Sequence, residues 1–146
     1  MAEIDDLSGE VVHCAVRIHR DLGPGLFESV YEMVLAGSLA RKGLKVDRQR
    51  PIDIMFEGVR YDAAFRIDLV VEDALLVEVK SVERLAPVHG KQLLTYLRLT
   101  RQPVGLLLNF SGATMKEGIR RVVNDYRQPH QSSASPRLRV NQSTEL

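Results

Sequence analysis

The chain has 146 residues, of which 45% are hydrophobic, and this size and composition are typical of a single globular domain with a moderate core. The formal net charge is +1, and residues 1–126 carry 17 basic and 18 acidic groups. Overall charge therefore gives no support to nucleic-acid binding, although local patches can still contact phosphates. The single cysteine, Cys14, excludes an internal disulfide and a thiolate cluster for zinc or iron–sulfur.

The chain ends suggest where the domain lies and in which compartment it works. No stretch approaches the roughly 20 apolar residues of a membrane span, and the first residues are acidic where a signal peptide would be basic. We therefore expect a cytoplasmic protein without a membrane contact. Residues 1–126 form the expected domain, and residues 127–146, rich in Ser, Pro and Gln, are expected to be a disordered tail.

Two amphipathic helices are predicted first. Apolar residues recur at steps of three or four across residues 4–22, which indicates a helix with Cys14 on its buried face. A second helix is predicted to begin at about residue 27, and Gly43 is a typical C-terminal stop.

Three strands are predicted next. Residues 45–56 and 59–71 are joined by Glu57 and Gly58, which resemble a two-residue hairpin turn. Residues 75–81 are a third strand, after the short polar link 72–74.

A crossover unit completes the predicted order. Residues 88–100 are predicted to be a helix and residues 104–110 a buried strand, so this strand should run parallel to residues 75–81. A closing helix is predicted over residues 114–126. The predicted order is ααβββαβα.

The most informative residues are Asp68, Glu78 and Lys80. If residues 72–74 form a three-residue loop, Asp68 lies opposite Glu78, with β-carbons about 5 Å apart, and Lys80 projects from the same face as Glu78. Two ionised carboxylates among apolar runs need a cation. That cation is either a metal ion or, in a purely structural salt bridge, the ammonium group of Lys80.

The chain resembles the GxxExxY proteins of the PD-(D/E)XK nuclease superfamily over about residues 8–125. The family's naming motif stands here at Gly25, Glu28 and Tyr31. The later landmarks follow in order as Gln49, Pro51, Ile52, Asp68, Glu78, Val79, Lys80, Gln92, Tyr96 and the strand end Leu107 to Phe110. Ile67 stands where the superfamily signature has proline. The resemblance implies an α/β, restriction-endonuclease-like PD-(D/E)XK core with a mixed central sheet flanked by helices.

The resemblance further implies a metal-dependent nuclease that hydrolyses phosphodiester bonds in DNA. Asp68, Glu78, the backbone carbonyl of Val79 and Glu28 would hold Mg²⁺ or Mn²⁺, the ions that hard oxygen ligands favour. Lys80 would orient the attacking water or stabilise negative charge on the phosphorane. Glu28 also has a simpler explanation, because an acid in the first turn of a helix interacts favourably with the helix dipole.

The catalytic set implied by the resemblance also includes Gln92 and Tyr96, which share one helix face because they are four residues apart. Their spacing resembles the QxxxY motif of RecB-like nucleases, which borders the active site and helps to place the DNA strand. The alternative is that Tyr96 belongs to the core among the leucines, and Tyr31 is expected to pack beneath the site.

Several further residues and functions stay open from the sequence. His19 is a possible metal ligand, His89 is a possible cleft residue, and the possible phosphate contacts are Arg84, Lys91, Arg120 and Arg121. The alternative function is a catalytically inactive nuclease-fold module that binds nucleic acid or a protein partner. A nuclease subunit that acts within a homodimer or a partner complex is a third possibility.

Overall fold

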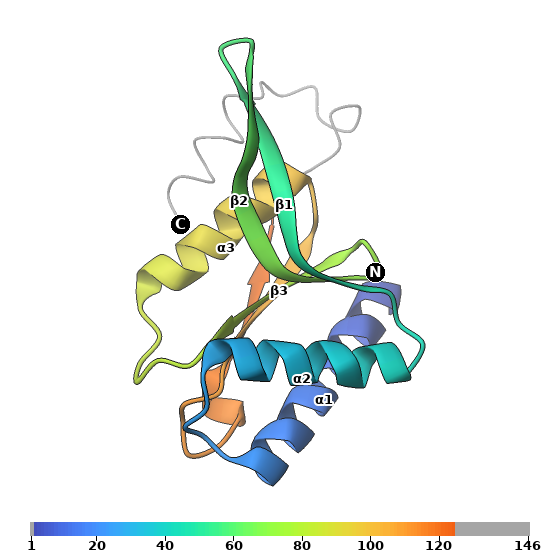
Figure 1. Cartoon of the computed structure of the whole chain (residues 1–146), viewed down its shortest axis with the longest axis vertical. Coiled ribbons are helices and arrows are strands. Elements are labelled where there is room, and N and C mark those ends of the chain that lie inside the picture. The colour runs from blue at the N-terminus through green and yellow to red at the C-terminus, as the bar shows by residue number, and fades with distance from the viewer. Residues whose placement is uncertain (1, 125–146) are drawn as a thin grey trace.

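The computed structural model describes residues 2–124 and shows a five-stranded mixed sheet flanked by helices (Figure 1). The elements in chain order are α1 (Ala2–Leu22), α2 (Glu28–Arg41), β1 (Val46–Phe56), β2 (Val59–Val71), β3 (Leu75–Lys80), α3 (Pro87–Thr100), β4 (Val104–Asn109), the short 3₁₀ helix η1 (Lys116–Gly118) and β5 (Ile119–Val123). The strands lie side by side in the order β1-β2-β3-β4-β5. This arrangement confirms the predicted α/β class.

Helices α1 and α2 cover one face of the sheet. The buried stripe of α1 includes Val11, Cys14 and Ile18, so the cysteine lies on the buried face as predicted. These side chains pack with one set of alternate strand residues, such as Val77 and Leu106. Alternation along the strands sends the other set, with Leu76 and Leu107, to the opposite face, where α3 covers them.

The hairpin of β1 and β2 is long and extends beyond the rest of the sheet (Figure 1). Its turn follows the prediction, because Phe56 pairs with Val59, which leaves Glu57 and Gly58 as a two-residue turn. Both turn residues have positive φ angles, 51° and 77°, as the hairpin turn that matches the twist of the strands requires.

The register between β2 and β3 confirms the predicted three-residue link. Val71 pairs with Leu75, and the ladder continues to Leu69 opposite Val77. Strand β3 then pairs in parallel with β4, with α3 as the crossover between them. The predicted parallel pair is therefore confirmed.

The predicted closing helix over residues 114–126 is wrong. The chain forms η1 and then β5, which pairs antiparallel with β4 from Leu108 opposite Ile119 to Val104 opposite Val123. All six residues of β4 are buried, so a helix at this position would leave buried backbone groups along one edge of β4 without partners. The β-branched residues of β5 suit the strand that supplies those partners.

Two predictions lie partly or wholly outside the described residues. The domain boundary at residue 126 and the tail of residues 127–146 follow the last described residue, Asn124. Within residues 2–124, no helix is long and apolar enough to cross a membrane.

Candidate functional site

The candidate site forms where the ladder between β2 and β3 stops. Its last pair is Leu69 opposite Val77, and Asp68 and Glu78 are the next residues on the two strands. The amide N–H of Asp68 donates to Oε2 of Glu78 at 3.0 Å, and the amide N–H of Val79 donates to Oδ2 of Asp68 at 2.8 Å. The two carboxylates thus accept backbone hydrogen bonds where strand pairing ends, which brings them together as the register predicted.

Both carboxyl groups of this pair resist ionisation. Burial, followed by the charge of Asp68, raises the pKa of Glu78 to about 8, and the side chain of Glu78 belongs to a residue only 6% exposed. Burial also raises the pKa of Asp68, against the lowering effect of the Val79 N–H. Buried acids whose ionisation is opposed by a neighbouring carboxylate are the electrostatic condition under which a cation binds well.

Lys80 lies on the same face of β3 as Glu78, and its charge lowers the pKa of both Glu78 and Asp68. Within residues 2–124, however, Lys80 makes no ion pair with either acid at 4.0 Å or less. The structural salt bridge that was the alternative from the sequence is therefore not formed. The charge of Lys80 thus favours ionisation of both acids from a distance, without a direct ion pair to either carboxylate.

The backbone carbonyl of Val79 faces the gap between β2 and β3, in which the carboxyl groups of Asp68 and Glu78 lie. The amide of Phe110, beyond the end of β4, donates to the carbonyl of Lys80 at 2.9 Å. Successive carbonyls of a strand point to opposite sides, so the carbonyl of Val79 is directed toward β2. That is also the side on which its own N–H meets Asp68.

The first turn of α2 brings Glu28 to the end of β3. Oε2 of Glu28 accepts a hydrogen bond from the N–H of Ser81 at 3.2 Å, and the charge of Glu28 raises the pKa of Asp68. Its other oxygen accepts no hydrogen bond within residues 2–124, and the same holds for Oε1 of Glu78. Glu28 is therefore close enough to Asp68 for its charge to affect that carboxyl group. A role limited to the helix dipole would not require this proximity.

Tyr31 positions the loop that precedes Glu28. Its hydroxyl donates to the carbonyl of Gly23 and accepts from the N–H of Leu26 at 3.2 Å, while its ring stacks on Phe110 with centroids 4.4 Å apart. The tyrosine is fully buried, which confirms the expected packing role. The spacing between Glu28 and Tyr31 places one side chain at the site and the other beneath it.

Glu32 and Gln49, which the sequence patterns left without a role, complete the hydrogen-bond network around Asp68. Nε2 of Gln49 donates to Oε1 of Glu32 at 2.8 Å and to Oδ1 of Asp68 at 3.2 Å. Glu32 is buried, and its Oε2 accepts from Nε of Arg48 at 3.2 Å. The four-residue spacing from Glu28 to Glu32 was the available signal, since it places both acids on one helix face.

Helix α3 approaches the acid pair from the other face of the sheet. The Tyr96 ring stacks on Phe65, with centroids 4.2 Å apart. Burial, followed by the charges of Glu78 and Asp68, raises the pKa of the Tyr96 phenol, and a hydrogen bond with Gln92 lowers it. Tyr96 is therefore both a packing residue and a neighbour of the acids.

Comparison with known proteins agrees with this geometry. The sequence model of the PD-(D/E)XK nuclease superfamily matches residues 5–122. This chain belongs to the PD-(D/E)XK nuclease superfamily. Members are generally nucleases that typically use divalent metal ions. The crystal structure of SSO0001 aligns with 14% sequence identity and a TM-score of 0.43, covering 92% of this chain and 74% of that one. No curated protein matches.

The position of the PD-(D/E)XK signature proline is filled by Ile67. This residue is fully buried in the cluster beneath α3, together with Leu93 and Leu97. It pairs with Arg50 of β1, so β2 keeps its pairing with β1 on one side while it separates from β3 on the other.

The histidines expected to be possible site residues have other partners. Nε2 of the buried His19 lies 2.9 Å from the carbonyl of Gly112. Nδ1 of His89 accepts the N–H of Ala86 at 3.0 Å and so caps the start of α3.

The arginines of β5 also have partners. Arg121 forms an ion pair with Asp5 at 2.7 Å, and Arg120 donates to the carbonyls of Glu117 and Ile119. The side chains of Arg84 and Lys91 form no hydrogen bond or ion pair among the described residues.

The available oxygen ligands suit a hard cation that keeps several waters better than an ion coordinated entirely by side chains. Within the described part of the chain, no three His, Cys, Asp or Glu side chains form a ready metal-binding group. Asp68 and Glu78 supply two carboxylates, and Val79 supplies a carbonyl directed to the same gap. Mg²⁺ commonly keeps several waters and takes one or two protein carboxylates, so these residues fit that ion.

Proposed function

We propose that this protein is a metal-dependent nuclease that hydrolyses phosphodiester bonds in DNA. The observation that carries the proposal is the interlocked pair of Asp68 and Glu78, whose carboxyl groups meet where β2 and β3 separate. Lys80 lies on the same strand face. Together with the superfamily match over residues 5–122, this arrangement supports phosphodiester chemistry over a purely structural role.

In this proposal Asp68, Glu78 and the Val79 carbonyl hold Mg²⁺ or Mn²⁺ directly, and Glu28 reaches the ion through one of its bound waters. A divalent ion there lowers the pKa of an attacking water and neutralises charge that develops on the phosphate. The chain's own contribution is to hold the donors: the Val79 N–H holds Asp68, and the Ser81 N–H orients Glu28. The unengaged oxygens of Glu28 and Glu78 supply further donor capacity.

Lys80 has an electrostatic role in the proposed reaction. To act as a base it would need a strongly lowered pKa, and two nearby carboxylates oppose that change. Its ammonium group instead donates to the attacking water or to a phosphate oxygen, where it stabilises the negative charge of the transition state.

Helix α3 supplies the proposed contact with the DNA strand. Gln92 can both donate and accept hydrogen bonds, and its bond with Tyr96 links it to the margin of the acid pair. We therefore retain the assignment of Gln92 and Tyr96 as a motif of the RecB-like type. Membership of the GxxExxY family is proposed from Gly25, Glu28 and Tyr31.

Cleavage of single-stranded and double-stranded DNA with Mg²⁺ tests the proposal. We expect the wild type to cleave, and Asp68→Ala and Lys80→Ala to lose most activity. Asp62→Ala is the matched acidic control, because within residues 2–124 Asp62 pairs only with Arg60 on the exposed hairpin, and it should cleave like the wild type. Equal activity in the wild type, Asp68→Ala and Lys80→Ala would refute the assignment.

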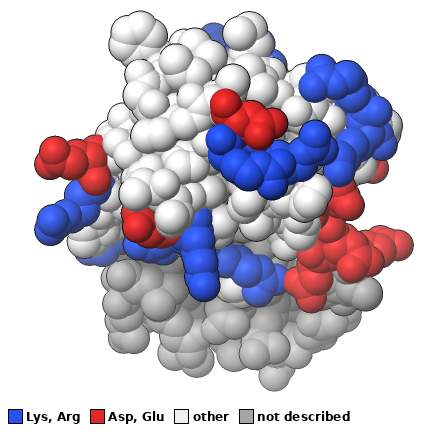
Figure 2. Space-filling model, turned by 90° about the horizontal axis from the view of Figure 1, so that it is seen from below, with Lys and Arg blue, Asp and Glu red and all other residues white. Residues whose placement is uncertain are grey.

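One observation favours the second candidate, a nuclease-fold module that binds without cleaving. The face in Figure 2 carries separate basic and acidic groups instead of a continuous basic surface. Calorimetry with Mn²⁺ separates the two candidates. Uptake abolished by Glu78→Ala supports the nuclease, and no uptake by the wild type supports the binding module.

The oligomeric state of the active protein can be measured independently of DNA cleavage. A homodimer or a complex with a protein partner would be compatible with the nuclease. The molar mass in solution, measured by light scattering with and without DNA, decides whether the active species is a monomer.

A further inference from the structure

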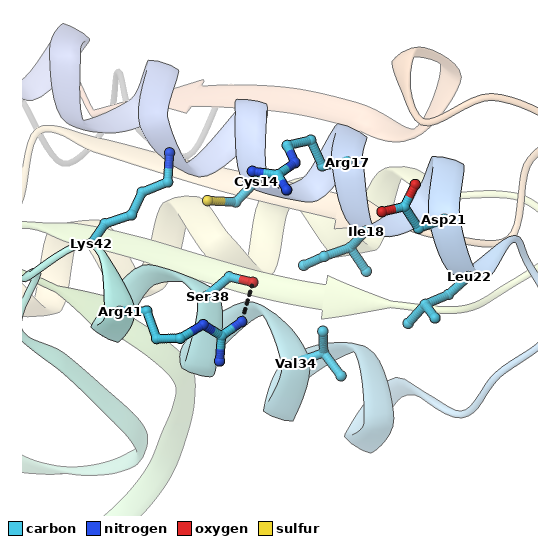
Figure 3. A pocket seen from close by; sticks show the side chains of 9 residues that line it. All are labelled: Cys14, Arg17, Ile18, Asp21, Leu22, Val34, Ser38, Arg41 and Lys42. Carbon is cyan, nitrogen blue, oxygen red and sulfur yellow. Dashed lines mark hydrogen bonds between the residues drawn. The ribbon is translucent and has the colours of Figure 1, made fainter.

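A cavity with polar and apolar lining residues lies between α1 and α2, apart from the acid pair. Its volume is about 400 Å³, within the usual range for small-molecule pockets. The lining residues that matter here are Cys14, Arg17, Ile18, Ser38, Arg41 and Lys42 (Figure 3). They come from both helices, so the cavity depends on how α1 and α2 pack.

Three cationic side chains surround this cavity, and two of them lack an acidic partner within the described chain. Lys42 pairs with Glu10 at 3.0 Å. Arg41 has only a long hydrogen bond to the hydroxyl of Ser38, at 3.4 Å, and Arg17 makes no ion pair or hydrogen bond within residues 2–124. The exposed side chains of Arg17 and Arg41 therefore border the cavity without an ion pair to a carboxylate of the described chain.

The three cationic side chains all interact electrostatically with the thiol of Cys14. The charges of Lys42, Arg17 and Arg41 all lower the pKa of the Cys14 thiol, although burial has the larger effect and raises it. The thiol belongs to a buried residue at the inner side of the cavity. An anion placed among these side chains would relieve the repulsion between like charges.

The remaining lining gives the cavity an apolar side and a polar end. Ile18, Leu22 and Val34 supply aliphatic surface. In Figure 3, Lys42 and Asp21 lie toward opposite ends, with Arg17 and Arg41 between them. A ligand with an anionic group, an apolar body and hydroxyl groups would match this distribution.

We propose that the cavity between α1 and α2 binds a phosphate monoester carried on an apolar or aromatic body, of the size of a mononucleotide. Arg17 and Arg41 bind the phosphate, because a guanidinium group matches phosphate oxygens with two parallel hydrogen bonds. The hydroxyl of Ser38 donates a further hydrogen bond. The aliphatic surface packs on the body, and Asp21 accepts from its hydroxyl groups.

The cavity is independent of the proposed nuclease site. Val34, Ser38 and Arg41 line it from one side of α2. Glu28 and Glu32 lie on another side, where they contact Ser81 just after β3 and Gln49 of β1. Loss of DNA cleavage would therefore leave this proposal intact, and loss of ligand binding would leave the nuclease proposal intact.

Calorimetry on the full chain tests the proposal with adenosine 5′-monophosphate, adenosine, inorganic phosphate and a DNA duplex as separate probes. We expect the monophosphate to bind, and adenosine to bind at least about tenfold more weakly because it lacks the charge-assisted bonds. Arg17→Gln and Arg41→Gln should each weaken the monophosphate by at least about tenfold. Arg60→Gln removes the same charge from the distant hairpin and should bind like the wild type.

The sole cysteine provides a local readout. Bound monophosphate should slow the alkylation of Cys14 in the wild type but not in Arg17→Gln at the same concentration. No binding of the monophosphate at millimolar concentration, or unchanged binding in both arginine variants, would overturn the proposal. Binding of the duplex alone, with the same dependence on Arg17 and Arg41, would also overturn it and would make the cavity a contact for nucleic acid.

Discussion

Replacing Glu78 by glutamine should change how the stability of the metal-free protein depends on pH. The pKa of Glu78 rises from 4.5 to about 8 on folding, so the folded state holds a proton that the unfolded state releases. Below about pH 4.5 both states are protonated and this group does not reduce stability. As the pH rises from there toward 8, stability falls, and above about pH 8 the loss is complete.

The size of the loss follows from the shift. Each pKa unit corresponds to about 1.4 kcal/mol, so between about pH 4.5 and pH 7 the unfolding free energy should fall by about 3 kcal/mol because of Glu78 alone. The neutral side chain in Glu78→Gln does not titrate and can still accept the N–H of Asp68. The variant should therefore lose much less stability across this range.

Urea unfolding in EDTA at several pH values measures this difference. Exposed Glu83 provides the control, and Glu83→Gln should follow the wild type. Added Mn²⁺ should restore stability to the wild type near neutral pH and leave Glu78→Gln unaffected, because the variant lacks a metal carboxylate. If the wild type and Glu78→Gln lose stability in parallel in EDTA, the reasoning about a buried, repelled carboxyl group is refuted.

Three further substitutions test the site and the scaffold. Lys80→Ala should lower DNA cleavage by about 10²-fold or more, the usual cost of removing one transition-state donor, while Mn²⁺ binding by calorimetry persists; loss of Mn²⁺ binding would contradict the electrostatic role. Tyr31→Phe should cost about 1–2 kcal/mol in urea unfolding through its two lost hydrogen bonds and should also reduce cleavage, because the loop before Glu28 loosens; full stability would count against this. Gly118→Ala should cost about 1–3 kcal/mol, since a Cβ there would lie 2.0 Å from the last carbonyl oxygen of β4. Gly9→Ala meets nothing within 4 Å and should not destabilise, so equal unfolding free energies for the two glycine variants would contradict this packing argument.

Most elements followed from local patterns, and the failure at residues 114–126 shows where such patterns stop. Ile119, Val122 and Val123 are compatible with a short helix face or a strand when considered alone. The choice between helix and strand depends on the edge of β4 that β5 pairs with, which is more than ten residues away in the chain. Backbone groups at a buried sheet edge need partners, and that requirement overrides weak local preference.

The candidate site likewise contains some residues whose positions could be predicted from the sequence and others whose positions could not. The opposition of Asp68 and Glu78 could be predicted, because a three-residue link sets the register of a hairpin. The contact between Glu32 and Gln49 could not be predicted, because α2 meets β1 only in the folded chain. Gln49 also adopts a positive φ of 52°, so the direction of its side chain does not follow from alternation along the strand. The absence of an ion pair from Lys80 within the described residues likewise depends on side-chain placement.

The sequence by itself determined the helix periodicity, the two hairpin turns, the parallel crossover and the pair of acids on adjacent strands, because each depends on residues close in the chain or on one register. Only the tertiary structure decided that β2 and β3 separate at Asp68, that α2 brings Glu32 to Gln49, and that α1 and α2 border a cavity lined by Arg17, Arg41 and Lys42. These features arise from the packing of distant elements, where burial and charge act through space regardless of separation along the chain.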